Sequence, residues 1–285
     1  MKKLFKSLAV ALAALTCFAF ASCAKKDEVK VFENILLTEE DYAFAIAKDN
    51  NTLELAVNAL ITGMKADGSL DRLINSYFDG TATFTYENKT SEPAAGDFVM
   101  ATNAYFPPFE SVEGSKFKGV DIEIASKIAT LLNKNLFVYD MEFDSIIASV
   151  KDGKADIGMA GMTVTDTRKE QVDFAIPYYS SAQVITVQKG DTTFDGCTTA
   201  AEVEAILKAQ TSSYKVGTQT ATTGYMYSAG DKDFGYDGFA NLTTKSYTTG
   251  ALAMKDLSNG KINAVILDLQ PSLMIAKSVN ASFAK

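Results

Sequence analysis

Apolar residues recur every three or four positions in several parts of the chain, as they do on the buried face of a helix. One such run, "GMKADGSLDRLINSYF" at residues 63–78, places its apolar side chains on one helical face: Leu70, Leu73, Ile74 and Tyr77. The following residues, 79–97, are polar and rich in Thr, Gly, Pro and Ala, without a sustained apolar period. The pattern predicts a helix that ends near residue 78 and a bridge that leads to a new packed segment.

From residue 98 onward, short apolar runs alternate with helical periods. Strands are predicted at 98–102, 136–141 and 155–162, and helices at 119–134, at 144–153 and after residue 165. In the first of these helices, Ile124, Ile128 and Leu131 form the expected buried stripe, and Thr165 is the expected N-cap of the last one. Such alternation indicates α/β layers with a largely parallel sheet.

The second half of the chain repeats part of the first. Residues 149–161 align with 256–268, so that Gly153 falls on Gly260, and both segments run into an apolar strand. Each predicts a helix closed by a C′ glycine and then a strand that ends at Gly161 or Asp268. Ligands bind beyond the carboxyl ends of strands in open α/β sheets. Two similar lobes are therefore predicted, with these two residues facing each other across a cleft.

Composition narrows the possible functions. With 47% hydrophobic and 22% charged residues, the chain is globular and long enough for one large domain or two lobes. A net charge of −8 and a pI of 4.8 argue against nucleic acid as a partner, because such binding needs a basic surface. The sequence has no histidine, which excludes Ser-His-Asp and Cys-His nucleophile systems and zinc sites that need imidazole.

Residues 1–22 have a basic start, an apolar stretch and small residues before a cysteine, which predicts an export signal rather than a membrane span. The end of this segment, "FASC", resembles a bacterial lipoprotein signal, in which Cys23 becomes the lipidated first residue. A plain cleaved signal with a free Cys23 is the alternative. Cys17 leaves with the signal, so a lipidated Cys23 leaves Cys197 without a disulfide partner.

Three segments carry a family resemblance: "ATNAYFPPFESVEGSKFKGVDIEIASKIA" (101–129), residues 143–190 around "GMAGMTVTDTRKEQVDF", and "KVGTQTATTGYMY" (215–227). In order and spacing they resemble the family 3 solute-binding proteins that deliver polar amino acids to ABC importers. The resemblance covers about residues 97–276. It implies an α/β, periplasmic-binding-protein-like (type II) fold, a two-lobed Venus-flytrap clamp joined by hinge strands. It also implies a binding protein rather than an enzyme, with no cofactor and no metal.

Residues 33–78 look like the family's carboxyl-terminal segment, which holds the returning hinge strand and two closing helices. In the family this segment follows the strand at 264–268 and its helix, but here it precedes them and no second copy follows. We interpret this order as a circular permutation; a partial duplication would predict the missing copy. The predicted lobe 1 is 46–187 with the bridge 79–97, lobe 2 is 29–41 plus 188–285, and the hinge strands lie near 42–47 and 182–188.

The resemblance implies roles for several site residues. Arg168 matches the arginine that grips the ligand α-carboxylate, and Thr163 and Thr223 match hydroxyl donors from opposite lobes. Asp268 supplies a countercharge for the ammonium group, and Gly161 offers its carbonyl. Without the resemblance, Arg168 would be read as a solvent-facing arginine, Asp268 as a helix cap and the threonines as turn residues.

Further contacts follow from the same resemblance. Phe106 and Phe143 match aromatic residues that sandwich the ligand. Asn103 replaces an aspartate common in the family, which favours a neutral polar amino acid over a cationic one. The remaining expected site residues are Met162, Gln219, Thr220 and Thr222.

The sequence thus predicts a monomeric lipoprotein that captures a free amino acid and presents it to an ABC importer permease. It would act at the cell envelope, on the periplasmic or extracellular face, with Cys23 as its only membrane contact. Two alternatives stay open: a dehydratase acting on cyclohexadienyl acids such as arogenate, with Glu110 as the candidate general acid, and a ligand sensor for a receptor.

Overall fold

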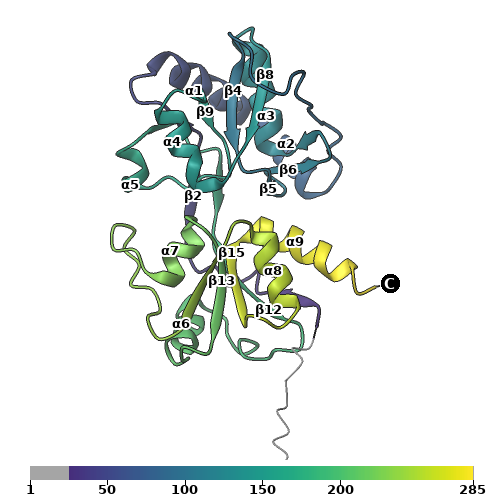
Figure 1. Cartoon of the computed structure of the whole chain (residues 1–285), viewed down its shortest axis with the longest axis vertical. Helices are drawn as coiled ribbons and strands as arrows, with labels where there is room; N and C mark the ends of the chain where they lie inside the picture. Colours follow the sequence, from purple (N-terminus) through teal and green to yellow (C-terminus); the bar gives the residue numbers. More distant parts are fainter. Residues whose placement is uncertain (1–25, 285) are drawn as a thin grey trace, which may run out of the picture.

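Two α/β lobes, stacked along the long axis of the molecule, make up residues 26–284, the part of the chain that the computed structural model describes (Figure 1). The predicted export signal and the predicted lipid acceptor Cys23 lie outside these residues. No helix within 26–284 combines the length and the apolar character that crossing a membrane requires.

Each lobe is built on a five-stranded sheet. The lobe 1 sheet has the order β10-β3-β9-β4-β8, with β3 (Ala45–Ile46), β4 (Phe98–Thr102), β8 (Leu136–Asp140), β9 (Ile157–Gly158) and β10 (Asp173–Phe174). The lobe 2 sheet has the order β1-β12-β15-β13-β14, with β1 (Val29–Val31), β12 (Gln183–Gln188), β13 (Lys215–Gln219), β14 (Thr243–Tyr247) and β15 (Ala264–Asp268). In each sheet three neighbouring strands are parallel, and an antiparallel strand follows on one side.

Helices cover both sheets. Those of lobe 1 are α1 (Asn51–Ala66), α2 (Ser69–Phe78), α3 (Val120–Leu131), α4 (Ile146–Lys151), α5 (Asp166–Lys169) and the 3-10 helix Phe143–Ser145. Those of lobe 2 are α6 (Ala200–Lys208), α7 (Thr223–Ala229), α8 (Gly250–Ser258) and α9 (Leu269–Ala281). A small sheet of β5 (Tyr105–Phe106), β6 (Glu110–Glu113) and β7 (Lys116–Lys118) completes lobe 1.

The helix predicted to end near residue 78 is confirmed. Its expected apolar stripe is buried in α2: Leu70, Leu73, Ile74 and Tyr77. Gly68, with φ of 70°, separates α2 from α1 in a left-handed conformation that glycine adopts without strain. Both helices pack against α3, so residues 51–78 belong to lobe 1 although they precede its first parallel strand by about twenty residues.

The repeat predicted from the sequence is also confirmed. α4 and α8 both end at a C′ glycine with positive φ, 71° at Gly153 and 68° at Gly260. At both ends the glycine amide and the next amide bond back to helix carbonyls, as in a Schellman motif. The strand that follows is β9 in lobe 1 and β15 in lobe 2.

Two local expectations are wrong. Only Ile157 and Gly158 of the predicted strand 155–162 pair as a strand, because the chain then turns toward the other lobe through Gly161, whose φ is 52°. Leu131 is 56% exposed, although Ile128 and Ala129 in the same turn of α3 are buried. Ile124 and Ile128 are fully buried as expected.

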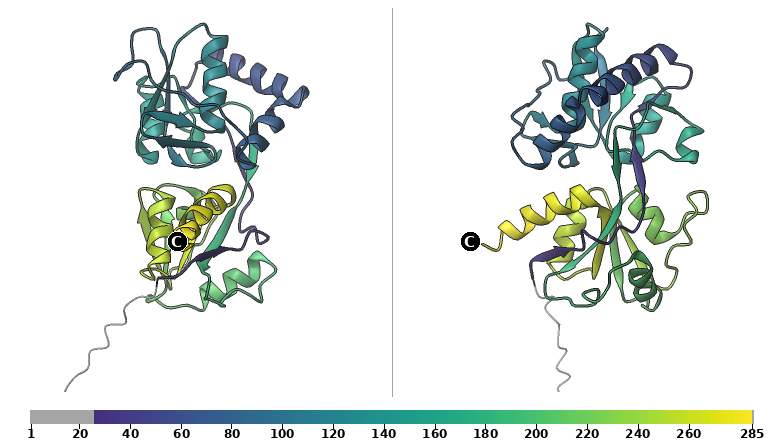
Figure 2. Two further views of the ribbon diagram at one scale, coloured as in Figure 1. Left: turned by 90° about the vertical axis from the view of Figure 1, so that its right-hand side faces the viewer. Right: turned by 180° about the vertical axis from the view of Figure 1, so that it is seen from behind.

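An antiparallel ladder of β2 (Glu40–Tyr42) and β11 (Tyr179–Ser181) connects the lobes. Figure 2 shows these two strands crossing side by side from one lobe to the other. The ladder lies a few residues before the segments 42–47 and 182–188, where the hinge was expected. Those segments contribute β3 to the lobe 1 sheet and β12 to the lobe 2 sheet. Residues 183–187, which the sequence analysis assigned to lobe 1, therefore lie in lobe 2.

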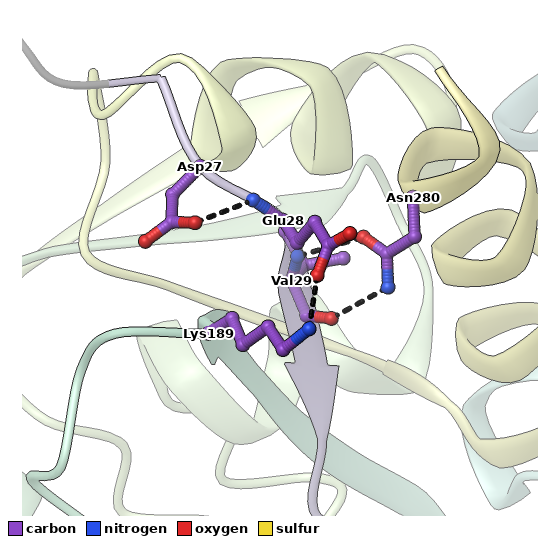
Figure 3. Close-up of polar contacts among 5 residues, drawn as sticks. All are labelled: Asp27, Glu28, Val29, Lys189 and Asn280. Atoms are coloured by element: carbon purple, nitrogen blue, oxygen red, sulfur yellow. Dashed lines mark hydrogen bonds and ion pairs between the residues drawn. The ribbon is translucent and has the colours of Figure 1, made fainter. Parts of the chain in front are cut away.

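An asparagine side chain closes one edge of each sheet. Asn88, in the bridge 79–97, donates to the carbonyl of Val138 at 2.8 Å and accepts from its amide at 2.9 Å. Asn280, near the end of α9, likewise donates to the carbonyl of Val29 and accepts from its amide, both at 2.8 Å (Figure 3). These contacts satisfy backbone groups that an edge strand would otherwise leave unpaired.

The contact of Asn280 joins the two ends of the described chain. We call this junction between residues 27–29 and the end of α9 the seam. Lys189 adds two contacts to it: its amide donates to the carbonyl of Glu28 at 2.7 Å, and its Nζ forms an ion pair with the Glu28 carboxylate (Figure 3). The amide of Asp27 donates to the carbonyl of Ser258 at 2.9 Å. Segments that are far apart in sequence thus form one continuous edge of lobe 2.

Candidate ligand-binding site

A small cavity lies between the lobes, at the carboxyl ends of their parallel strands. Lobe 1 contributes residues from the segments after β4 and β9, and lobe 2 contributes residues after β13 and at the end of β15. The lining residues are Asn103, Phe106, Glu110, Phe143, Ala160, Gly161, Thr163, Arg168, Gln219, Thr222, Thr223 and Asp268. Every site residue predicted within the described chain lines this cavity, except Met162 and Thr220.

Those two residues point elsewhere. Met162 is buried in the lobe 1 core beside Ala45 and Val99, because alternate side chains of an extended segment face opposite sides. Its neighbours Gly161 and Thr163 therefore face the cavity. Thr220 instead shares a hydrogen bond of 2.6 Å with Ser246 and donates to the carbonyl of Tyr247 at 3.0 Å. Neither residue lines the cavity, and their role as ligand contacts stays a prediction.

Arg168 lies at the centre of the cleft. The Thr165 hydroxyl accepts from its amide at 3.1 Å, so the N-cap places Arg168 in the first turn of α5 as the sequence predicts. The guanidinium is buried rather than solvent-facing. It donates to the carbonyl of Thr163 at 2.6 Å and, across the cleft, to that of Ala221 at 3.0 Å. Ala221 has a φ of 59°, an uncommon conformation for a residue other than glycine.

The ring of Phe143 lies 5.3 Å from the guanidinium carbon, within the range of a cation–π contact. Burial lowers the pKa of Arg168 to about 10, although nearby Glu40 and Asp268 oppose that shift. The side chain therefore remains charged at neutral pH. It is a fixed positive group in a site from which most water is excluded.

Asp268, at the end of β15, is 3% exposed and accepts a hydrogen bond from the hydroxyl of Tyr42. Its side chain does not cap α9, which was the alternative role. Burial, and next the negative charge of Glu40, raise the pKa of Asp268 to about 7. A ligand cation next to Asp268 would therefore stabilise its charged form.

Glu40 and Tyr42 are site residues that the sequence analysis missed. Both side chains of β2 are buried, whereas Asp41 between them is exposed. Glu40 accepts hydrogen bonds from three hydroxyl groups: Thr38 at 2.7 Å, Thr163 at 2.7 Å and Thr223 at 2.6 Å. The period-two alternation of "EDY" was the available signal, but the hinge was expected two residues later.

Glu110 is fully buried at the cavity wall, next to Asp121. Burial and the charge of Asp121 raise the pKa of Glu110 well above its ordinary value, which favours the neutral acid. Asp121 accepts from the hydroxyl of Tyr178 at 2.6 Å and from the amide of Gly161 at 3.1 Å, and burial raises its pKa to about 6. Asp121 thus ties the Gly161 loop to the start of α3.

The aromatic wall explains why residue 161 is glycine. A Cβ at this position would lie 2.7 Å from the ring of Phe106, closer than real Cβ contacts allow. Side chains also meet across the cleft, because Gln219 of lobe 2 donates to the amide oxygen of Asn103 at 3.0 Å. The Asn103 amide nitrogen donates to the carbonyl of Met141 at 2.8 Å, which fixes its orientation. Within residues 26–284, no group of His, Cys, Asp or Glu side chains is arranged to hold a metal ion.

Comparisons with known proteins point to one family. A model of the bacterial extracellular solute-binding proteins, family 3, matches residues 98–270, more than half of the chain. The arginine-binding extracellular protein ArtP of Bacillus subtilis is 37% identical over 102 residues, 36% of this chain and 40% of that protein. The arginine-binding periplasmic protein of Mannheimia haemolytica is 32% identical over 176 residues, 61% of this chain and 64% of that protein. The match thus spans less than two thirds of these relatives.

Solved structures agree on the fold. An ancestral amino acid-binding protein, AncCDT-1, described as a precursor of cyclohexadienyl dehydratase, has a TM-score of 0.55 and 27% identity over 64% of this chain and 74% of its own. An ancestral arginine-binding protein bound to arginine has a TM-score of 0.53 and 31% identity, with the same coverage. The fold is therefore that of the type II amino-acid-binding clamps, as the sequence analysis expected.

The titration of Asp268 generates the first prediction. Its pKa is about 7 in the folded chain against an ordinary 3.8, so the folded state binds more protons between these values. Raising the pH through this window favours the unfolded chain, and this group lowers the free energy of unfolding by at most about 1.4 kcal/mol per pH unit. Urea titrations of the ligand-free protein between about pH 4 and about pH 8 measure the slope. Asp268→Asn should flatten it, and equal slopes for both proteins would contradict the assignment.

Proposed function

Because the chain belongs to the bacterial extracellular solute-binding proteins, family 3, we propose that it captures one free amino acid between its lobes and delivers it to an ABC importer. The observation that carries this proposal is the buried charge pattern of the cleft. Arg168 offers a cation, and Asp268 offers a carboxyl group from the opposite lobe. A zwitterion presents the complementary charges, and buried charges must be paired.

In this proposal Arg168 grips the α-carboxylate by a bidentate, charge-assisted pair, which lysine could not copy. Thr163 and Thr223 add hydroxyl donors from the two lobes. Asp268 and the carbonyl of Gly161 hold the ammonium group. Closure follows because the ligand binds the closed arrangement better than the open one, while the β2–β11 ladder bends.

Phe106 and Phe143 would sandwich the ligand side chain, with Gln219, Thr222 and Asn103 as its polar neighbours. The amide of Asn103 supports a neutral polar amino acid as the ligand. A cationic amino acid is the second candidate, because Glu40 and Asp268 place two buried carboxyl groups near a single guanidinium. The names of the arginine-binding relatives add weight to this second candidate.

An enzyme on the same fold is a third candidate. Glu110 favours the protonated form at the cavity wall, which a general acid requires. The likeness to a dehydratase precursor belongs to this candidate as well. We place it behind binding because that structure is itself described as an amino acid-binding protein.

We also propose that the chain is a circular permutation of the family fold. The family model and the solved structures match this chain only from the first parallel strand onward or over about two thirds of its length. Residues outside the matched range nevertheless supply β3 of lobe 1, β1 of lobe 2 and helices α1 and α2. Two places would differ from the chain order of the family. One is the contact of Val29 with Asn280, where the family chain would continue, and the other is the bridge 79–97, where the family chain would begin and end.

The remaining proposals concern location. We propose that the mature protein is a monomer, lipidated at Cys23, on the periplasmic or extracellular face of the cell envelope. The support is the sequence of residues 1–23 together with a family described as extracellular. Its partners would be the free amino acid, the importer permease and, through the lipid alone, the membrane.

Thermal unfolding against the twenty amino acids and prephenate tests the binding function. A ligand at about a thousand times its Kd adds about 4 kcal/mol, a shift of roughly ten degrees for a protein of this size. We expect a shift with one or a few amino acids, either neutral polar or cationic, without turnover. A shift with prephenate alone, or its conversion, would support the enzyme instead.

Arginine variants test the carboxylate grip. Arg168→Ala should weaken binding at least about a hundredfold, because two charge-assisted hydrogen bonds of about 1.5 to 3 kcal/mol each are lost. Arg168→Lys keeps the charge and should recover only part of the affinity. The matched control is Arg72→Ala, since Arg72 is the other arginine of the chain and its contact is an exposed 3.1 Å bond to the carbonyl of Asp67. Equal affinities of the two alanine variants would remove Arg168 from the site.

A reopened chain tests the permutation. A short Gly/Ser linker would join Phe283 to Lys26, and the new termini would be placed within the exposed stretch 89–95. We expect a folded protein with ligand affinity within a fewfold of the original, because both junctions lie at the surface. The same linker with new termini inside α3 is the control. Failure of both chains to fold would contradict the proposed seam.

Replacing the proposed lipid acceptor tests the location. Cys23→Ser should abolish palmitate incorporation and release the exported protein from membranes in a host that processes lipoproteins. Cys17→Ser, within the proposed signal, is the control and should leave both properties unchanged. Membrane association that survives Cys23→Ser would exclude the anchor.

A further inference from the structure

Glu40 occupies the position that the proposed function gives to a ligand carboxylate. One of its oxygens, Oε2, accepts from the hydroxyl of Thr163 at 2.7 Å and from that of Thr223 at 2.6 Å. These are the two hydroxyl groups, one from each lobe, that would hold the α-carboxylate of an amino acid. A carboxylate already sits between them, and it belongs to the protein.

The hydroxyl groups cannot serve both carboxylates at once. Each threonine carries a single O–H proton, and here both protons are directed to Glu40. Thr223 has little freedom to turn away, because Gln183 Nε2 donates to its oxygen at 3.0 Å. Thr38 donates to the other oxygen of Glu40 at 2.7 Å, which fixes the orientation of the carboxylate.

The same oxygen ties the lobes together. Thr163 belongs to the loop after β9 in lobe 1, Thr223 begins α7 in lobe 2, and Glu40 lies on β2 between them. Two other contacts cross the cleft, from Arg168 to Ala221 and from Gln219 to Asn103. Of the three, only the Glu40 contact involves a full negative charge of the kind a ligand would bring.

We propose that Glu40 is an internal ligand of the cleft. In the ligand-free protein its carboxylate holds the two threonine hydroxyls and stabilises the closed arrangement, and an entering amino acid must displace it. The claim that an entering amino acid displaces Glu40 rests on the proposed function, whereas the claim that Glu40 stabilises the closed arrangement does not. The displaced carboxylate would stay close to the ligand carboxylate, so the site penalises neutral amino acids more than cationic ones.

Two variants in one strand separate this role from a general effect of charge. Glu40→Gln keeps the shape of the side chain but removes its negative charge and replaces one accepting oxygen by an NH2 donor, so the three hydroxyl groups can no longer all donate to it. Asp41→Asn makes the same charge change one residue later, where the side chain is exposed and accepts from Ser180 at 2.8 Å. Both positions lie in β2, so any effect on the ladder itself is shared.

The lobe separation of the ligand-free protein is the first measurement. Spin labels at Ser115→Cys in lobe 1 and Lys255→Cys in lobe 2, both exposed, would report it in chains that start at Ala24 and carry Cys197→Ser. We expect a mainly short distance with Glu40 present and at least about a threefold smaller closed fraction in Glu40→Gln. Asp41→Asn should match the parent. A parent that is mainly open, or identical distributions for all three chains, would overturn the proposal.

Binding of L-glutamine and L-arginine is the second measurement. Glu40→Gln should lower the Kd for L-glutamine at least about tenfold and change the Kd for L-arginine less. A higher Kd for L-glutamine would show that Glu40 supports the ligand instead of competing with it. If neither amino acid binds any of the chains, competition with these two ligands is excluded, while the distance measurement still decides the role of Glu40 in closure.

Discussion

The structure depends on how charge is buried between the two lobes. Arg168 is buried, and the carboxyl groups of Glu40 and Asp268 share its surroundings. In a site of low dielectric, each charge needs partners that stay fixed. Backbone carbonyls from both lobes hold the guanidinium, hydroxyl groups from both lobes hold Glu40, and Tyr42 holds Asp268. The lobes are therefore positioned by the same groups that would meet a ligand.

Similar construction of the lobes makes this meeting possible. In each lobe a helix ends at a left-handed glycine and a strand carries the chain to the cleft, at Gly161 on one side and Asp268 on the other. The β2–β11 ladder then places Glu40 and Tyr42 between them. A short connection of two strands joins the lobes, and side chains of one of these strands contact the site.

Much of this arrangement could be predicted from the sequence, because local patterns determine it. The stripe of α2, the Thr165 cap and the paired glycines depend on spacing within a few residues. The predictions failed where contacts between distant segments determine the position of a side chain. Leu131 has an apolar position on its helix but no neighbour to cover it, and Met162 alternates away from a loop whose direction the sequence does not reveal.

Glu40 shows the same limit in the site. Its role depends on strand register, since a shift of one residue would exchange Glu40 and Asp41 between cleft and solvent. The resemblance placed Arg168, Thr163 and Asp268 at the cavity through their motifs, but it assigned only a hinge role to the segment that contains β2. A buried carboxylate that meets hydroxyl groups from distant segments leaves no local signature in the chain.

The asparagine seam has a consequence for the entropy of folding. Asn280 and Val29 are separated by 251 residues, so their contact closes a loop that includes nearly the whole described chain. The cost of closing a flexible loop grows only with the logarithm of its length, by about 0.6 kcal/mol for each doubling. A contact between the ends therefore costs about 1.2 kcal/mol more at equilibrium than one across a quarter of that sequence separation. The separation also affects the folding rate, because β1 must find β12, a strand more than 150 residues later in the chain.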